Sequence, residues 1–419
     1  MTRQLVIFED EGYTNLLPLT WTRPATRLRC GIVNLWEKVV AAYSDAEIVI
    51  HTRDYVAPVV AEEIPKVKVN SLGAASALLI NGRAVAPHNI AQLIPLSGDD
   101  RVYLSGGEVV AARLGGGRLT AIAKLIESGA PLAKGWTDGI ATQEVDVPVI
   151  KYPWDLITQN PKQIEADFAR MGLAGKCAGI VHDSAVLTDM NRIHVADGAE
   201  VQAGAILIAD GGPIYIGPGA KVMAGAVVEG PASVGAKSSI KILAKIYEGT
   251  SIGEFCKIGG EVEECIFQAY SNKQHDGFKG HSFFGEWINV GADSNNSDLK
   301  NNYSTVRVKI NGQEIDSGSL FVGSTVGDHS KSGINSMINT GTVIGVGCNL
   351  YGGDFPPKYI PSFCWGGAAG FVEHQLEKFL STAERVMGRR KRELTAAHRA
   401  MLTKVYELTR DERARIIKP

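Results

Sequence analysis

The sequence predicts an α/β N-terminal domain with a mainly parallel sheet, then a left-handed parallel β-helix of hexapeptide repeats and a helical C-terminal tail. Three observations predict this order. Short apolar runs alternate with helix-like stretches up to about residue 150. Branched aliphatic residues then recur in six-residue steps, and apolar residues return at helical spacing beyond residue 372. Each of these periods is typical of one kind of structure.

Residues 1–150 are predicted to form the α/β domain. The apolar runs 5–8, 47–50 and 78–80 are short and are bounded by polar residues, as expected for buried strands. Helix-like stretches lie between them. This alternation favours a parallel sheet covered by helices.

A helical linker is predicted over residues 151–175. Pro161 is expected to start this helix, because proline is well tolerated in a first helical turn. Ile164, Phe168 and Met171 then lie on one face at helical spacing.

The six-residue repeat is the strongest signal in the chain. A period of six fits neither a helix nor a flat strand, but it is typical of a solenoid whose coil has three short faces. Further steps occur on both sides of the main run, so the solenoid is predicted over 176–368. The segment 295–319 has no such pattern and is expected to leave the coil. The central run comprises Ile216, Val222, Val228, Val234, Ile240, Ile246, Ile252 and Ile258.

Residues 369–419 are predicted to be helical, with Thr395 as the N-cap of a second helix. The basic run 389–392 has two interpretations. It is either a solvated helix face or a patch that attracts the phosphates of coenzyme A.

Composition narrows the class of protein. The 419 residues carry a net charge of −2 and 45% apolar residues, which favours two or three globular domains and argues against nucleic acid as a partner. We expect neither a signal peptide nor a membrane span. The six cysteines are scattered without metal-binding spacing, which predicts a reducing, cytoplasmic location.

Four motifs carry a resemblance to a known family, and they lie at 15–24 (NLLPLTWTRP), 152–157 (YPWDLI), 280–286 (GHSFFGE) and 353–358 (GDFPPK). The chain resembles the bifunctional UDP-N-acetylglucosamine pyrophosphorylase / glucosamine-1-phosphate N-acetyltransferase family, and more closely a divergent bacterial branch of sugar nucleotidyltransferases. The resemblance implies N-acetylation of an amino-sugar phosphate by acetyl-CoA and uridylyl transfer from UTP with Mg²⁺. It also implies a homotrimer whose ligands are small molecules.

In the resembling acetyltransferases, a histidine of a Gly-His motif removes the proton of the attacking amine, and His281 takes that position. A pKa near neutrality suits a general base. His275 is a competing base, and Glu286 is expected to orient His281. The family has a tyrosine three residues after the histidine, where this chain has Phe284.

The stretch 270–300 around His281 breaks the six-residue pattern and is densely polar. The resemblance implies that Asn289, Asn295 and Asn296 orient the sugar or the acetyl carbonyl, and an asparagine ladder that caps turns is the alternative. Its lysines are expected either to pair with a sugar phosphate or to be solvated. These lysines are Lys273 and Lys279.

The nucleotidyl-transfer site is less complete in the sequence. The first strand is followed by the acidic run Glu9, Asp10 and Glu11 in place of a glycine-rich phosphate loop. Three arginines come next, and they either bind phosphates or form salt bridges with that acidic run. They are Arg23, Arg27 and Arg29.

A weak Mg²⁺ site is predicted in the same domain. The family places an aspartate after a middle strand, where this chain has Asn81, a neutral and weaker ligand. Asp155 is the candidate for the missing carboxylate, and an anchor of the linker is the alternative role.

Two further functions compete. A zinc enzyme of the γ-class carbonic anhydrase type would use His275, His281 and His329 as ligands. A non-catalytic scaffold would only bind a sugar nucleotide in its first domain.

Overall fold

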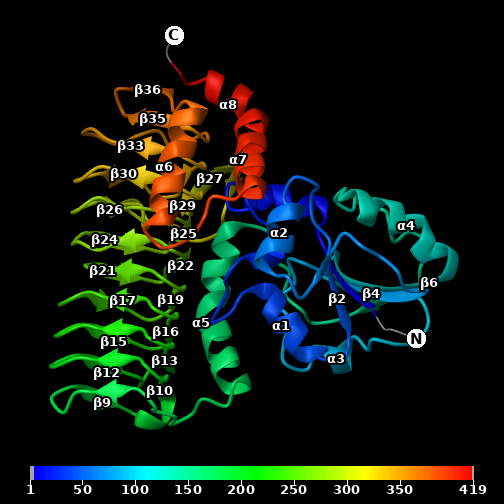
Figure 1. Cartoon of the computed structure of the whole chain (residues 1–419), viewed down its shortest axis with the longest axis horizontal. Coiled ribbons are helices and arrows are strands. Elements are labelled where there is room, and N and C mark those ends of the chain that lie inside the picture. The colour runs from blue at the N-terminus through cyan, green and yellow to red at the C-terminus, as the bar shows by residue number, and fades with distance from the viewer. Residues whose placement is uncertain (1–3, 418–419) are drawn as a thin grey trace.

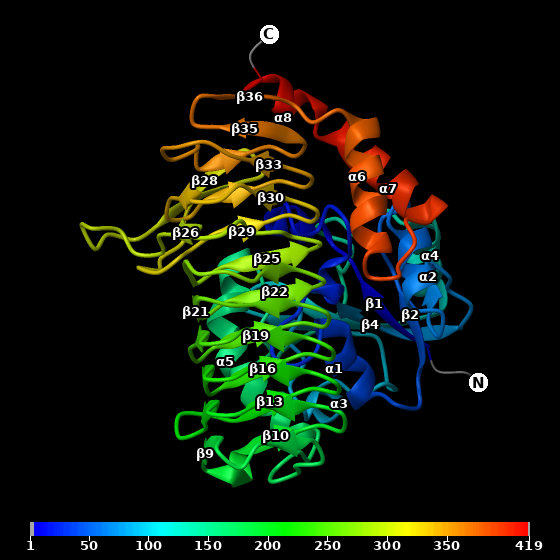
Figure 2. The ribbon, with the colours of Figure 1, turned by 60° about the vertical axis from the view of Figure 1, so that its left-hand side comes forward.

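The computed structural model describes residues 4–417. An α/β domain lies beside a long solenoid, and the C-terminal helices pack between the upper solenoid and the α/β domain (Figures 1 and 2). The three parts follow the predicted order. None of the helices described is both long enough and apolar enough to cross a membrane.

The N-terminal domain is built on a seven-stranded sheet of order β3-β2-β1-β4-β6-β5-β7. Strands β1 to β4 are mutually parallel, whereas β6 runs antiparallel to both of its neighbours. The three predicted strands correspond to β1, β2 and β4. The strands are β1 Gln4–Phe8, β2 Glu47–Ile50, β3 Lys68–Val69, β4 Ser76–Asn81, β5 Arg101–Ser105, β6 Glu108–Gly115 and β7 Thr142–Glu144.

Helices cover both faces of this sheet. Alternate side chains of β1 point to opposite faces, so Leu5 and Ile7 pack with Val39 of α1, whereas Val6 and Phe8 pack on the side of α4. The mainly parallel α/β domain is therefore confirmed. The helices are α1 Leu35–Ala42, α2 Ala57–Glu63, α3 Ile90–Leu93 and α4 Gly116–Ser128.

Helix α5 (Pro153–Arg170) joins this domain to the solenoid and runs along its side (Figure 1). The prediction that Pro161 starts the helix is wrong, because Pro153 occupies the first turn and Pro161 lies inside. Asn160 of α5 bonds to both the solenoid and the first domain. Its amide nitrogen donates to the carbonyl of Gly249 at 2.7 Å, and its oxygen accepts from the backbone of Gly31 at 2.6 Å.

The solenoid has three faces formed by stacked parallel strands, which we call the domain face, the second face and the third face in chain order. The domain face packs against α5 and the α/β domain. It consists of β10 Ile193–Val195, β13 Ile214–Ile216, β16 Ala232–Val234, β19 Thr250–Ile252, β22 Ile266–Ala269, β25 Phe283–Glu286, β29 Thr325–Val326, β32 Val343–Ile344 and β34 Tyr359–Ile360.

The other two faces are built in the same way. The second face consists of β8 Ile180–Val181, β11 Glu200–Val201, β14 Lys221–Val222, β17 Ser239–Ile240, β20 Lys257–Ile258, β23 Asn272–Lys273, β30 Lys331–Ser332, β33 Asn349–Leu350 and β35 Cys364–Gly367, edged by antiparallel β36 Gly370–Glu373. The third face consists of β9 Val186–Thr188, β12 Ile206–Ile208, β15 Val227–Glu229, β18 Lys245–Ile246, β21 Glu261–Glu263, β24 Phe278–Gly280, β26 Asn295–Asn296 and β31 Met337–Ile338.

The six-residue repeat marks the core of the solenoid, as predicted. All eight residues from Ile216 to Ile258 belong to one buried apolar cluster and are at most 2% exposed. Parallel register stacks each on the equivalent residue of the next coil, as Ile240 stacks below Ile258. Each coil therefore buries one side chain from each face.

The polar stretch does not break the coil, and that expectation is wrong. Strand β23 pairs with β20 so that Lys273 lies opposite Ile258, and Lys279 lies opposite Val262. Both lysines therefore point into the core. Asn296 also belongs to the coil, where its amide donates to the carbonyl of Gly280 at 3.0 Å. The chain leaves the coil only after this strand, in an excursion that contains the hairpin of β27 Arg307–Ile310 and β28 Gln313–Asp316.

Lys279 is 3% exposed and lines an apolar core cavity of about 30 Å³. Burial, together with the smaller effect of the charge of Lys273, lowers the pKa of Lys279 to about 7. The unfolded chain, in which the pKa is 10.5, therefore binds one more proton between pH 7 and 10.5. Stability contributed by this group rises with pH across that window and is lowest at and below pH 7.

Replacing Lys279 by methionine is expected to raise the free energy of unfolding by a few kcal/mol at pH 6 to 7, on the order of what such a pKa shift implies. The gain should shrink as the pH rises from 7 towards 10.5, because deprotonating the amine for burial costs less as the pH approaches the pKa of the unfolded chain. Urea unfolding across this pH range measures it. Lys124→Met, at an exposed position of α4, is the control. A gain that does not vary with pH would contradict the assignment.

The C-terminal helices are α6 Leu376–Gly388, α7 Ala396–Leu408 and α8 Arg410–Ala414. The hydroxyl of Thr395 accepts from the backbone of His398, so the predicted N-cap is confirmed. Phe379 of α6 and Leu402 of α7 bury Phe363 of the solenoid together with Val59 of α2. The tail thus connects the solenoid to the first domain.

Candidate active site

His281 lies at the corner where the chain passes from the third face to the domain face, between β24 and β25. Its backbone adopts a left-handed conformation with φ of 45°, which turns the chain at this corner. Nδ1 lies 2.8 Å from a carboxylate oxygen of Asp298, and Nε2 lies 3.4 Å from Glu264. The ring stacks on Phe321, with centroids 5.0 Å apart. The imidazole is therefore held in one orientation by three neighbours.

The surroundings of His281 are acidic. Burial alone would lower the pKa of His281, but the hydrogen bond with Asp298 and the charges of Glu264 and Glu263 outweigh burial and raise the pKa above its usual range. The side chain keeps 14% of its surface exposed. The corner thus combines a basic imidazole with a negative environment that attracts cationic groups.

Glu286 does not orient His281, contrary to the expectation. Its carboxylate pairs with the guanidinium of Arg23 at 2.8 Å, and the carboxylates beside the imidazole are those of Asp298 and Glu264. Glu286 is the last residue of β25, so it lies at the opposite end of this strand from His281. Asp298 follows His281 by seventeen residues, about one coil, and this spacing was the signal that could have identified it.

The remaining candidates of the polar stretch are separated from His281. His275 is exposed at the corner between the second and third faces. Lys273 donates to the carbonyls of Gly259 and His275 at 2.8 and 2.6 Å inside the solenoid. Burial lowers the pKa of Lys273 to about 8. Neither Lys273 nor Lys279 reaches the surface to pair with a sugar phosphate, which corrects their assignment.

The three asparagines have different positions. Asn289 is exposed on the second face, and Asn295 is exposed on the third face, where its oxygen accepts from the backbone of Phe278 at 2.7 Å. Asn296 is buried with Ser282 beneath the His281 corner. Only Asn296 is therefore near the imidazole, and it supports the coil from within.

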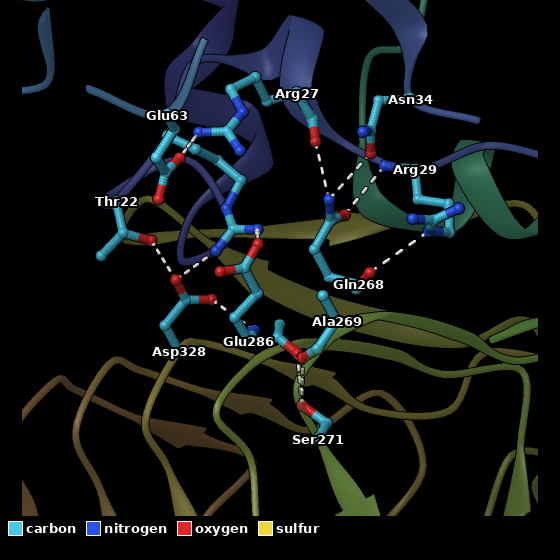
Figure 3. Close-up of polar contacts among 12 residues, drawn as sticks. Thr22, Arg27, Arg29, Asn34, Glu63, Gln268, Ala269, Ser271, Glu286 and Asp328 are labelled. Atoms are coloured by element: carbon cyan, nitrogen blue, oxygen red, sulfur yellow. Dashed lines mark hydrogen bonds and ion pairs between the residues drawn. The ribbon is translucent and has the colours of Figure 1, made fainter. Parts of the chain in front are cut away.

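The three arginines lie at the interface between the first domain and the solenoid, where Figure 3 shows Arg27 and Arg29. Arg23 contacts Glu286 and Asp328, both on the solenoid. Thr22 also donates to Asp328, at 2.7 Å. The salt-bridge interpretation predicted Glu9, Asp10 or Glu11 as partners, and these partners are wrong.

The neighbouring arginines are paired as well. Arg27 contacts Glu63 of α2 (Figure 3), and Arg29 contacts Glu254 at 2.7 Å. The side-chain amide of Gln268 bonds to the backbone of both arginines, at 2.8 and 2.9 Å. These contacts fix the first domain on the solenoid and leave the arginines neutralised by carboxylates.

The carboxyl edge of the first sheet, where α/β domains bind ligands, is occupied by ion pairs. Arg83 pairs with Asp10 at 2.6 Å and with Glu108 at 2.9 Å. Asn81 is fully buried, and its amide donates to Asp10 at 2.9 Å while its oxygen accepts from the backbone of Arg83 at 2.9 Å.

Asp155 accepts hydrogen bonds from the backbone of Lys151 and Tyr152, at 2.8 and 2.9 Å, and so caps the start of α5. Both of these hydrogen bonds end on Oδ2 of Asp155, and both polar side-chain atoms of Asn81 are engaged by Asp10 and Arg83. The guanidinium of Arg83 already balances the neighbouring carboxylates. These residues do not fit Mg²⁺, and the predicted metal site is corrected.

The zinc interpretation also fails within the chain. His275, His281 and His329 lie at three different corners of the solenoid, and His329 is buried between Trp287 and Phe379. Among residues 4–417, no group of three histidine, cysteine, aspartate or glutamate side chains could hold a metal ion.

Comparisons with known proteins give matches of limited extent to a family and to a curated protein, and likenesses to solved structures. A curated relative, the bifunctional sugar-1-phosphate nucleotidylyltransferase/acetyltransferase of Sulfurisphaera tokodaii, is 33% identical over 106 residues, which is 25% of this chain and 26% of that protein. The chain thus aligns with about a quarter of that relative.

Among solved structures, the UDP-N-acetylglucosamine acyltransferases of Arabidopsis and Campylobacter jejuni align at 11% and 14% identity, each with a TM-score of 0.21. The alignments cover 57% and 56% of this chain and 91% and 83% of those chains. Residues 5–173, which comprise the first domain and α5, match the sugar nucleotidyl transferase family.

Proposed function

We propose that the solenoid transfers an acetyl group from acetyl-CoA to the amine of an amino-sugar 1-phosphate such as glucosamine-1-phosphate. The N-terminal domain then transfers a uridylyl group from UTP, which gives UDP-N-acetylglucosamine. The observation that carries the proposal is the imidazole of His281, held through Nδ1 by Asp298 at an acidic corner of the solenoid. The match of residues 5–173 supports the nucleotidyl half.

The chemistry follows from the two ring nitrogens. With the proton of Nδ1 directed to Asp298, Nε2 carries the lone pair that accepts a proton. As the sugar nitrogen attacks the thioester carbonyl, an N–C bond forms and the C–S bond breaks. The proton of the amine passes to Nε2 and then to the departing thiolate. Glu263 and Glu264 favour the approach of a substrate that arrives as an ammonium ion.

A homotrimer would complete this site. The chain leaves the solenoid after β26, near the His281 corner, and its hairpin of β27 and β28 packs Val308 and Ile310 against Val343 of the domain face. Exposed apolar side chains accompany this excursion: Tyr303 is 70% exposed and Phe321, beside the imidazole, is 43% exposed. We propose that neighbouring copies pack on these side chains and enclose the acetyl-CoA arm. Light scattering tests the trimer, and a monomer would contradict it.

The nucleotidyl half has a competing proposal, binding of a sugar nucleotide without turnover. This alternative is favoured by Arg83, whose guanidinium lies between carboxylates at the carboxyl edge of the sheet. No step through Mg²⁺ is derived from these residues.

One incubation tests both halves. The protein is mixed with glucosamine-1-phosphate, acetyl-CoA, UTP and Mg²⁺, and free thiol and pyrophosphate are followed separately. Thiol release that requires the amino sugar supports acetyl transfer, and pyrophosphate release supports uridylyl transfer. Release of thiol without release of pyrophosphate would support acetyl transfer by the solenoid, and it would favour binding of a sugar nucleotide without turnover in the first domain. Absence of thiol release would contradict the acetyl-transfer proposal.

Asp298→Asn is expected to shift the pH dependence of acetyl transfer. Asp298 raises the pKa of His281, and the base works only when it is deprotonated, so kcat/KM rises with pH through that pKa. Removing the negative charge should move this rise to lower pH and reduce the maximal rate. Asp183→Asn, at an exposed position, is the control. An unchanged midpoint in the Asp298 variant would show that His281 is not the titrating base.

A further inference from the structure

A cavity of about 340 Å³ lies between the second face of the solenoid and the end of helix α6. One wall is a single column of outward residues on successive coils, because Lys257 pairs with Asn272, Asn272 with Asn289, and Asn289 with Lys331. Arg389 and Arg390 form the opposite wall. We call this cavity the basic groove, defined by Lys257, Asn272, Asn289, Lys331, Arg389 and Arg390.

The charge of the basic groove is not balanced by the protein. Its lining contains four cationic side chains and no carboxylate. Within residues 4–417, none of these four side chains forms an ion pair, although the chain as a whole carries a net charge of −2. In the described chain, the guanidinium of Arg390 donates to the amide oxygen of Asn272 at 2.9 Å, and the amine of Lys331 donates to the carbonyl of His329 at 2.8 Å.

Burial and, at Lys257, neighbouring cations disfavour the charged form of the lysines in the basic groove. Burial lowers the pKa of Lys257, and the nearby charges of Arg390, Lys241 and Arg389 lower it further. Burial also lowers the pKa of Lys331 to about 8. A bound anion would relieve this repulsion, because it favours the charged form of each lysine.

The spacing of the groove indicates an extended ligand. Three coil steps separate Lys257 from Lys331, which is about 14 Å at the usual distance between strands. The amides of Asn272 and Asn289 lie between the two lysines and provide hydrogen-bond donors and acceptors. The planar guanidinium groups of Arg389 and Arg390 suit phosphate oxygens.

We propose that the basic groove binds the diphosphate of a nucleotide. The groove lies along the second face, whereas His281 lies at the corner between the third face and the domain face, so this site is separate from the proposed base. A nucleotide diphosphate occurs both in coenzyme A and in a nucleotide sugar. Binding is measured without turnover, so the result is independent of the proposed acetyl transfer.

Calorimetry of the full chain with inorganic pyrophosphate, coenzyme A and UDP-N-acetylglucosamine tests the proposal. Pyrophosphate and at least one of the two nucleotides should bind, and affinity should fall as salt is raised. Preferential binding of one nucleotide identifies the source of the diphosphate. If none of the three probes binds wild-type protein at millimolar concentration, the proposal is overturned.

Variants locate the binding. Lys257→Gln and Arg390→Gln should each weaken binding by about tenfold, the value of one hydrogen bond to a charged group. Lys257 makes no hydrogen bond through its amine within the described chain, so its replacement preserves the fold even if Arg390→Gln disturbs Asn272. Arg385→Gln, one turn earlier on α6 and outside the groove, should bind as wild type. Equal weakening by Arg385→Gln, or none by Lys257→Gln, would contradict the groove as the site.

Discussion

His281→Ala is expected to lower kcat for acetyl transfer by roughly a hundredfold or more, the usual contribution of a positioned general base. The variant loses the only imidazole that Asp298 holds at this corner. Alanine keeps a Cβ at the left-handed position, so the backbone strain of the corner is unchanged. The fold and the oligomeric state should therefore persist, and steady-state thiol release measures the loss.

The matched control for this variant is His275→Ala. His275 is exposed at another corner of the same coil, so its removal should leave the rate close to wild type. The opposite pattern, with a rate lost in His275→Ala and kept in His281→Ala, would transfer the base to His275. If both variants keep the wild-type rate, neither histidine acts as the base of the reaction.

Arg23→Met is expected to lower the free energy of unfolding by about 3–5 kcal/mol, the range for breaking a buried ion pair. Arg23 is 5% exposed and lies between Glu286 and Asp328. Without the guanidinium, the carboxylate of Asp328 stays buried and retains only neutral donors, from Thr22 and from the backbone of Glu286. Urea unfolding measures the loss, and proteolysis near α5 should become faster as the two domains separate.

Two further variants make this prediction specific. Arg23→Met combined with Asp328→Asn should recover part of the lost stability, because the unpaired charge is removed. Arg118→Met breaks an exposed pair with Asp100 and should change stability by about 0.5 kcal/mol or less. If Arg23→Met is no more harmful than Arg118→Met, the contact between the domains does not depend on this pair.

The solenoid was predictable because its core repeats. Every sixth residue from Ile216 to Ile258 is a buried aliphatic one, so the period can be recognised in the sequence alone. Further along, the coil continues with Lys273, Lys279 and Asn296 at equivalent inward positions. Backbone hydrogen bonds between coils hold these strands in place, so the coil tolerates polar residues at inward positions. These polar residues interrupt the aliphatic repeat, and the sequence alone therefore does not reveal that the coil continues.

The candidate site was predicted in part. The Gly-His pattern led to His281, but Glu286, at the end of the strand that follows it, was expected as its partner, whereas Asp298 on the next coil holds the imidazole. In a solenoid the neighbours of a side chain lie about one coil away, so Glu264 and Asp298 flank His281 from seventeen residues before and after. The arginines after the first strand were paired with local carboxylates in the prediction, whereas domain packing supplies Asp328 and Glu254.

The position of the new acetyl group tests the central claim most directly. Wild-type protein is incubated with isotopically labelled acetyl-CoA and either glucosamine-1-phosphate or glucose-1-phosphate, and the sugar product is examined by nuclear magnetic resonance. The account predicts a labelled acetyl group on the nitrogen of glucosamine-1-phosphate and no acetylated product from glucose-1-phosphate. With His281→Ala, the labelled glucosamine product should fall by roughly a hundredfold or more. Two results would contradict an amine acetyltransferase built on the His281 corner. One is a labelled acetyl group on an oxygen of both sugars, and the other is N-acetylation that persists at the wild-type rate in His281→Ala.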